Sequence, residues 1–225
     1  NLSPKTIGGI FQGTITSWDD ASIKADNPDA DLPATKITPV HRSDDSGTTK
    51  NFTDYLDQAS DGAWQGGVVE TWPVKGGEAA EGTSGVVAAV TNGKGTIGYA
   101  DASQAGELGT AHVKVGDSFT EVTPEAAAKI LDASTQVEGR AATDIAIEVD
   151  RKVAEDGVYP IVLVSYQIAC QTYDDKATAD LVKGWLSYVA SAEGQEVAAT
   201  DAGSAPLSDA VADKVKTAVD SIAAA

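Results

Sequence analysis

The sequence predicts a mixed α/β fold, because segments with a helical spacing of apolar residues alternate with β-prone segments. Residues 48–56 and 176–192 carry apolar side chains every three or four positions, whereas residues 158–170 form a continuous run rich in β-branched residues. In addition, 42% of the residues are hydrophobic, which is enough for a globular core. The 225 residues suffice for one large domain or two small ones.

A short capped helix is predicted near the N-terminus, in the segment SPKTIGGIFQG. Ser3 is a favourable N-cap, and Pro4 suits the first helical position, because a proline lacks the N–H group that would have no partner there. Apolar residues then follow at helical spacing: Ile7, Ile10 and Phe11. These features predict a helix with one apolar face.

A turn-rich segment, a short strand and a second helix are predicted next. The segment DNPDADLPATKITPVHR begins with turn-forming residues and ends in a short strand that reaches Arg42. The helix starts near Ser46 or Gly47. Its apolar residues recur at intervals of three and four: Phe52, Tyr55 and Leu56.

Two more helices and a strand are predicted in the middle of the chain. The segment SGVVAAVTNGKGTIGYAD predicts a helix that stops at Asn92 and Gly93, followed by a strand over residues 96–100. The segment VTPEAAAKILDAS predicts a helix with Thr123 as N-cap and Pro124 just inside it.

The C-terminal region predicts elements that lack a partner. Residues 158–170 predict a strand buried on both faces, and helices are expected at 176–192 and 207–223. The first of these helices carries an apolar face: Leu181, Trp185, Tyr188 and Val189. A sheet to cover this face is hard to find in residues 1–168, so we expect the face to pack on strands absent from that range. The chain is therefore expected to be incomplete.

The formal net charge of −18 excludes some classes of partner. Nucleic acid is excluded because no basic patch persists in such a field, and docking on anionic lipid headgroups is excluded for the same reason. The acidity is otherwise typical of an abundant exported protein that must stay soluble. No apolar run approaches the length of a membrane span.

Neither a metal site nor an internal disulfide is expected. His41, His112 and Cys170 form no ligand cluster in the sequence. Cys170 is the one cysteine, so it closes no disulfide within the chain. Its apolar surroundings predict a buried, inert thiol, and pairing with a cysteine outside this sequence stays open.

The segment HRSDDSGTTKNFTDYL combines the features of an anion site. A helix start presents unpaired N–H groups and the positive end of the helix dipole. Ser46 and Thr48 add hydroxyl donors there, and Gly47 lets a ligand approach the backbone closely. Arg42, at the end of the preceding strand, is suited to a two-pronged bond with a tetrahedral oxyanion. Asp44 is close enough in sequence to hold that guanidinium by a salt link.

An ordinary strand, turn and capped helix explains the same residues equally well, with Ser46 as N-cap and Arg42 in solvent. A nucleophilic role for Ser46 is less favoured, because the G-x-S-x-G pattern is missing and neither histidine has a recognisable setting for a base. The motif alone leaves the anion site and the simple cap as equal alternatives.

Four segments resemble, in order, the phosphate-binding proteins of bacterial phosphate ABC importers: GGIFQGTITSWDDASIKADNP, LPATKITPVHRSDDSGTTKNFTDYL, GKGTIGYAD and YPIVLVSYQIAC. The similarity extends to the closing segment GSAPLSDAVADKVKTAVDSI, so it covers essentially the whole chain. It implies a two-lobed, periplasmic-binding-protein-like fold of type 2 with phosphate enclosed in the cleft. It also implies an extracytoplasmic protein that delivers phosphate to a membrane permease. No cofactor is expected.

The resemblance implies roles for the residues of the anion segment. The positions that match Arg42, Ser46, Gly47 and Thr48 supply one lobe's phosphate contacts through a guanidinium, hydroxyls and helix-start N–H groups. The position that matches Asp44 steadies the arginine. Short-range donors of this kind, in a dry cleft, outweigh a screened global charge.

The resemblance also implies a division of the chain into lobes. Family members carry a substantial segment before the part that corresponds to Asn1, and it builds the first lobe's sheet. That segment also supplies the other phosphate contacts, including the carboxylate that rejects sulfate. Residues 1–166 are then expected to be most of the second lobe, and residues 167–225 to return to the first lobe as its terminal helices.

Three other functions stay open at this point. The first is binding of another tetrahedral oxyanion such as sulfate, since the selecting residue lies outside this sequence. The second is a secreted phosphatase-like hydrolase that uses Ser46, for which no base or metal is found. The third is a truncated or degenerate binding protein with a structural or interaction role. A lipid anchor, through a segment outside this chain, is also left open.

Overall fold

The computed structural model describes residues 1–225, and the chain forms two compact units. Unit 1 consists of residues 1–122 and 151–163, and unit 2 consists of residues 123–150 and 164–225. Helices and short strands both occur along the chain, so the predicted mixed α/β class is confirmed. Residues 123–150 group with the C-terminal helices, although the sequence places the boundary between lobes at residue 166. The assignment of the units to lobes stays a prediction.

The sheet of unit 1 has three parallel strands in the order β2-β1-β3. The strands are β1 (Thr38–Arg42), β2 (Glu78–Ala80) and β3 (Thr96–Gly98). The register pairs Arg42 with Ala80 of β2, but the pairing with β3 ends at Val40 and Gly98. The central strand β1 therefore extends two residues past its pairing with β3. The predicted strand that ends at Arg42 is confirmed.

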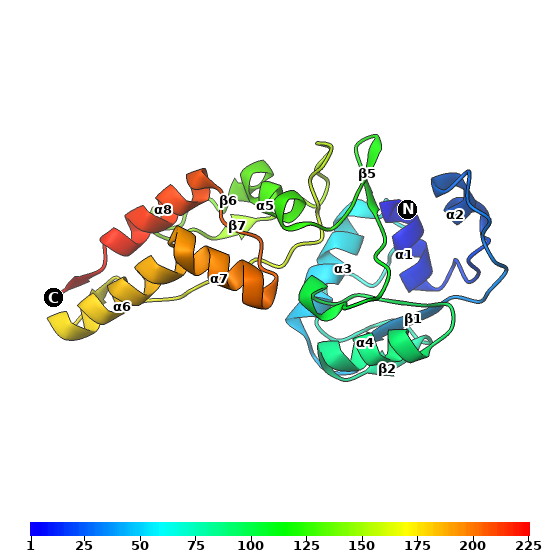
Figure 1. The fold of residues 1–225 in the computed structure, drawn as a ribbon, viewed down its shortest axis with the longest axis horizontal. Coiled ribbons are helices and arrows are strands. Elements are labelled where there is room, and N and C mark those ends of the chain that lie inside the picture. The colour runs from blue at the N-terminus through cyan, green and yellow to red at the C-terminus, as the bar shows by residue number, and fades with distance from the viewer. The chain divides into compact units, whose positions relative to one another are not determined.

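Helix α4 (Gly82–Asn92) packs on this sheet and runs alongside it in Figure 1. A Cβ atom on Gly98 would lie 2.9 Å from Cγ1 of Val86 and 3.1 Å from Cγ2 of Val90. Glycine is therefore the residue that lets helix and strand approach each other at this point. The predicted helix that stops at Asn92 and Gly93 is confirmed, and so is the strand that follows from Thr96, although it ends at Gly98 and not at residue 100.

Helices α1 (Pro4–Gln12) and α3 (Gly47–Ala59) pack together in the core of unit 1. Ser3 caps α1, and its hydroxyl accepts a hydrogen bond from the N–H of Thr6. Both predicted helix starts are confirmed. The buried apolar residues of this core come from both helices and from the segments around them: Leu2, Ile7, Ile10, Phe11, Ile23, Ile37, Phe52, Tyr55, Leu56, Trp64, Tyr99 and Val113.

Unit 1 contains four smaller elements: helix α2 (Ala21–Asp26), the 3-10 turn η1 (Ala102–Gln104), and the strands β4 (Val113–Val115) and β5 (Ser118–Thr120). The last two form an antiparallel hairpin. The N-terminal end of the chain is tied to it, because Leu2 forms a parallel bridge with Val113.

The side chain of Arg151 holds the residues that follow it onto α3. It is buried, and its guanidinium donates to Oδ2 of Asp54 at 2.9 Å and to Oδ1 of Asn51 at 2.6 Å. The same guanidinium donates to the backbone carbonyl oxygens of Pro160 at 2.7 Å and Val162 at 3.0 Å. Because these carbonyls lie just before the chain leaves unit 1, one buried cation anchors this segment to the helix.

Unit 2 is built mainly of helices. Its elements are α5 (Pro124–Ala133), β6 (Thr135–Gln136), β7 (Ile147–Glu148), β8 (Thr172–Tyr173), α6 (Lys176–Val189), α7 (Ala192–Ala202), α8 (Asp209–Asp220) and β9 (Ala223–Ala224). Helices α6 and α8 lie side by side (Figure 1). The predicted cap of α5 is confirmed, since the side chain of Thr123 accepts from the N–H of Ala126 at 3.1 Å. None of the helices combines the length and apolar character that crossing a bilayer requires.

The prediction of two C-terminal helices was wrong, because there are three. The helix predicted over 176–192 ends at Val189, and α7 starts at Ala192 after two intervening residues. Its N-cap is Ser191, whose hydroxyl accepts from the N–H of Gly194 at 3.1 Å. Helix α7 ends where Gly203 takes a left-handed conformation. These local caps override the longer apolar spacing.

The predicted strand over residues 158–170 is also wrong, because none of these residues belongs to a strand. Ile168 is 95% exposed, and Cys170 is exposed rather than buried as predicted. A β-branched run favours a strand only where a neighbouring strand pairs with it and other layers cover it. No strand of the chain pairs with this run, and two of its carbonyls bind Arg151 instead.

The apolar face predicted for the first C-terminal helix lies on α6 and is open. Leu181 is 74% exposed and Trp185 is 60% exposed. The expectation that this face packs on strands absent from residues 1–168 stays a prediction.

Replacing Arg151 by methionine is expected to destabilise the protein by about 3 kcal/mol, because Asp54 and two carbonyls lose a buried charged donor. Urea denaturation of the full-length protein, followed by circular dichroism, measures this change. Arg140→Met is the matched control, because Arg140 pairs with Asp144 on the surface and its loss should leave the midpoint nearly unchanged. Equal midpoints for the two variants would contradict the anchoring role of Arg151.

Candidate functional site

The four residues predicted to bind an anion lie on one strand–turn–helix segment of unit 1. Arg42 is the last residue of β1, and Ser46 is the N-cap of α3. Gly47 and Thr48 are the first two residues of that helix. Asp44 lies in the turn between them. The supporting residue is thus on the same short segment as the other four.

Ser46 caps α3 with its side chain. Its Oγ accepts hydrogen bonds from the backbone N–H groups of Thr48 at 3.1 Å and Thr49 at 3.4 Å. Its own N–H donates to the carbonyl oxygen of Glu70 at 3.1 Å. The oxygen of Ser46 is therefore committed to the helix, while its hydroxyl hydrogen is free to be donated elsewhere. The simple-cap hypothesis is right about this residue.

The same hypothesis is wrong about Arg42, which is not a solvated cation. Its side chain is only 12% exposed and is paired with Asp44. Nε donates to Oδ1 of Asp44 at 2.7 Å, and Nη2 donates to Oδ2. Nη1 has no hydrogen-bond partner in the chain, so one edge of the guanidinium still has donors to offer.

Asp44 also closes the start of α4. Its Oδ1 accepts a hydrogen bond from the N–H of Gly82, the first residue of that helix, at 3.1 Å. Glu81, at the N-cap, contributes no side-chain bond, so the carboxylate of Asp44 serves instead. These bonds, led by the one from Arg42, hold the pKa of Asp44 well below its usual range. The same pairing raises the pKa of Arg42, so both groups stay charged.

Gly47 leaves open space at the start of α3. No protein atom lies within 4 Å of the position that a Cβ would take there. The N–H of Gly47 has no partner in the chain, and neither has the hydroxyl of Thr48. Together with the hydroxyl hydrogen of Ser46, this helix start offers unpaired donors around a backbone that a ligand is able to approach.

Two further residues complete this region, and sequence reasoning missed both. The phenolic oxygen of Tyr99, one residue after β3, accepts a hydrogen bond from the N–H of Arg42 at 3.2 Å. It also lies 2.7 Å from Oγ1 of Thr49. The carboxyl ends of neighbouring parallel strands meet at one edge of a sheet, and this rule would have pointed to Tyr99 once β1 and β3 were paired. Nothing in the sequence points to Thr49 beyond its place in the helix.

Aromatic rings surround the phenol of Tyr99. The ring stacks on Phe52 with a centroid distance of 4.5 Å and on Trp72 with a centroid distance of 5.8 Å. Trp72 in turn stacks on His41 at 5.0 Å. Burial raises the pKa of Tyr99, so its hydroxyl stays protonated at neutral pH.

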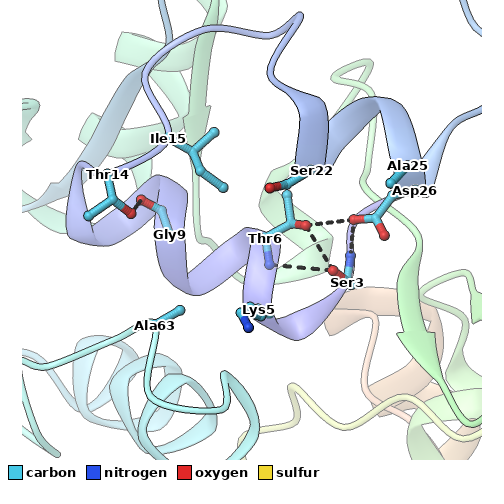
Figure 2. Close-up of a pocket in the computed structure, with 10 residues that line it drawn as sticks. All are labelled: Ser3, Lys5, Thr6, Gly9, Thr14, Ile15, Ser22, Ala25, Asp26 and Ala63. Carbon is cyan, nitrogen blue, oxygen red and sulfur yellow. Dashed lines mark hydrogen bonds between the residues drawn. The ribbon is translucent and has the colours of Figure 1, made fainter.

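A second helix start, that of α1, adjoins a cavity of about 390 Å³, and Figure 2 shows its lining. The carboxylate of Asp26 already occupies this helix start: its Oδ2 accepts from the N–H of Ser3 and from Oγ1 of Thr6, both at 2.7 Å. A negative group of the chain itself therefore lies beside this helix start and accepts two of its donors. None of the predicted site residues lines this cavity.

The structure brings no group of three or more histidine, cysteine or acidic side chains into an arrangement suited to a metal ion. The chemistry available at the start of α3 is hydrogen-bond donation to a small anion.

Several known proteins are similar to this chain. The phosphate-binding protein PstS 3 of Mycobacterium leprae is 36% identical over 230 residues, a match that covers 99% of this chain and 61% of the relative. The phosphate-binding protein PstS 2 of Mycobacterium tuberculosis is 36% identical over 228 residues, covering 99% of this chain and 60% of the relative. The chain thus spans about three fifths of the length of these relatives.

Solved structures show the same fold. A high-affinity periplasmic phosphate-binding protein bound with phosphate superimposes with a TM-score of 0.70 at 22% identity, covering 96% of this chain and 64% of that one. A phosphate-binding protein from Stenotrophomonas maltophilia gives a TM-score of 0.66 at 21% identity, with coverages of 96% and 64%. The predicted periplasmic-binding-protein-like fold is thereby confirmed.

A sequence model of the PBP superfamily domain matches residues 1–193. The resemblance to the phosphate-binding proteins of phosphate importers is confirmed by the relatives above. The chain therefore belongs to the family described as the PBP superfamily domain.

Proposed function

We propose that this chain binds inorganic phosphate at the start of α3 and that it belongs to the solute-binding protein of a phosphate ABC importer. The observation that carries the proposal is the set of unpaired donors around Gly47, next to a guanidinium held in place by Asp44. The names of the relatives and of the solved structures, which are phosphate-binding proteins, support it.

The donors suit a tetrahedral oxyanion. The N–H of Gly47 and the hydroxyls of Ser46 and Thr48 are neutral groups at the positive end of a helix dipole. Arg42 adds its free Nη1 edge. Since this cation is already paired with Asp44, the neutral dipoles make up most of the donors, and a binder that must release its ligand gains from that arrangement.

The hydrogen-bond donors at the start of α3 also explain how a protein of negative net charge is able to bind an anion. The chain carries a formal charge of −18, which repels an anion at long range. Salt screens that repulsion beyond about 8 Å at physiological ionic strength, whereas hydrogen bonds at contact distance are not screened in this way. Phosphate binding is therefore compatible with an acidic protein.

A hydrolase that uses Ser46 fits the geometry poorly. Its oxygen accepts two backbone hydrogen bonds in the cap, and no histidine contacts it. His41 points its Nδ1 to the carbonyl oxygen of Arg42 at 3.0 Å. A serine nucleophile needs a base within hydrogen-bond reach, so we propose a binding protein and not an enzyme.

The proposal extends to the setting of the whole protein. We propose that it works outside the cytoplasm and hands phosphate to a membrane permease, as its resemblance to the binding proteins of phosphate importers implies. The exposed apolar face of α6 fits a protein in which further strands, from a part of the same protein outside this sequence, cover this helix and complete the first lobe. We also propose that a lipid anchor, on a segment outside this sequence, attaches the protein to the cell.

Arg42→Ala in the full-length protein is expected to weaken phosphate binding by roughly 1.5–3 kcal/mol, because a charge-assisted hydrogen bond is lost. Isothermal titration calorimetry measures the change, with Arg140→Ala as the control for removal of an exposed arginine. Sulfate titrated into the unsubstituted protein tests selectivity in the same experiment. Unchanged phosphate affinity in Arg42→Ala would remove this residue from the site.

Gly47→Val in the full-length protein is expected to abolish phosphate binding, because the new side chain fills the space through which an anion reaches the backbone. The melting temperature of the ligand-free protein should stay nearly unchanged, since no protein atom lies within 4 Å of the new Cβ. Gly109→Val is the matched control, because Gly109 is equally unobstructed but lies in a loop outside α3. Normal phosphate binding by Gly47→Val would show that the helix start is only a capped end.

A further inference from the structure

Tyr99 stands where the hydrogen bonding of the sheet stops. The pairing of β1 with β3 ends at Val40 and Gly98, and Tyr99 follows directly. The N–H of Arg42 lies beyond this last pair, so β3 offers it no carbonyl in the ladder. The phenolic oxygen of Tyr99 accepts that N–H in its place, at 3.2 Å. A side chain thus continues the connection between the two strands.

The same phenol reaches the first turn of α3. Its oxygen lies 2.7 Å from Oγ1 of Thr49, a side chain with no exposed surface. The N–H of Thr49 donates to Ser46, so this threonine belongs to the cap itself. One hydroxyl therefore joins the backbone of Arg42 to the helix start that carries Gly47.

The ring of Tyr99 is in a fixed position. It is stacked between Phe52 of α3 and Trp72 with interplanar angles of 19° and 27°. Phe52 lies one helical turn after Thr49, so the ring contacts the same helix that its hydroxyl bonds. A ring held on this helix keeps its hydroxyl at a constant place relative to both partners.

We infer that Tyr99 is a positioning residue of the anion site, where its hydroxyl sets the spacing between Arg42 and the first turn of α3. This inference rests on the proposed phosphate binding. Tyr99 does not itself touch the anion. Binding by several donors from two elements requires those elements to be held within a fraction of an ångström, and this hydroxyl bonds directly to both.

Removing the hydroxyl would leave one part-buried and one fully buried group without this partner. The N–H of Arg42 and Oγ1 of Thr49 would each have to shift to find another hydrogen bond. Phenylalanine at position 99 keeps the ring and its stacking, so Tyr99→Phe changes only this connection. We expect the variant to bind phosphate about tenfold more weakly in the full-length protein, measured by titration calorimetry.

Ser60→Ala is the matched control. Ser60 is a fully buried hydroxyl at the other end of α3, and it accepts from the N–H of Trp64 at 3.0 Å. Its loss should lower the melting temperature while phosphate affinity stays unchanged. A role of Tyr99 in general stability alone would make Tyr99→Phe behave in the same way.

Substitutions of Thr49 test the other side of the connection. Thr49→Val should weaken phosphate binding as Tyr99→Phe does, whereas Thr49→Ser, which keeps the hydroxyl, should restore the affinity to within about threefold. The double variant of Tyr99→Phe and Thr49→Val should bind no more weakly than either single one, because both remove the same link.

Hydrogen exchange of the Arg42 amide, measured without phosphate, tests its hydrogen bond to Tyr99 directly. The amide should be protected in the unsubstituted protein and exchange faster in Tyr99→Phe. Unchanged affinity or unchanged exchange in Tyr99→Phe would overturn the positioning role and leave phosphate binding intact. If the unsubstituted protein binds no phosphate, the proposed function fails, and the positioning role falls with it.

Discussion

The carboxylate of Asp44 is the group on which the rest of the candidate site depends. It accepts hydrogen bonds from Arg42 at the end of β1 and from Gly82 at the start of α4. One side chain therefore orients the guanidinium and completes a helix that lacks a cap of its own. Because these bonds keep its pKa low, the carboxylate stays ionised and the orientation of Arg42 does not change with pH near neutrality.

The starts of α1 and α3 differ in the groups that accept hydrogen bonds from them. At α1, the carboxylate of Asp26 accepts from the backbone N–H of Ser3, and the chain itself supplies the negative group. At α3, Ser46 caps the deeper N–H groups, while Gly47 keeps an unpaired N–H beside open space. The two starts therefore differ in what lies beside them: a carboxylate of the chain at α1, and open space at α3.

Features that depend on neighbours in sequence were predictable. The caps at Ser3 and Thr123 and the grouping of Arg42 with Ser46 depend on residues only a few positions apart. Features that depend on tertiary structure were not. The hydrogen bond from the N–H of Arg42 to the phenolic oxygen of Tyr99 spans 57 positions, and it exists only because β3 pairs with β1. The run 158–170 fails as a strand for the same reason: its composition suits a sheet, but no strand of the chain pairs with it.

The central claim is that phosphate is held at the start of α3 by neutral donors beside an oriented arginine. A crystal structure of the full-length protein grown with phosphate tests this most directly. The account predicts phosphate oxygens at about 2.7–3.2 Å from the N–H of Gly47, from Oγ1 of Thr48 and from Nη1 of Arg42, with the salt bridge to Asp44 intact. Phosphate bound elsewhere, with the start of α3 in contact only with solvent, would contradict it.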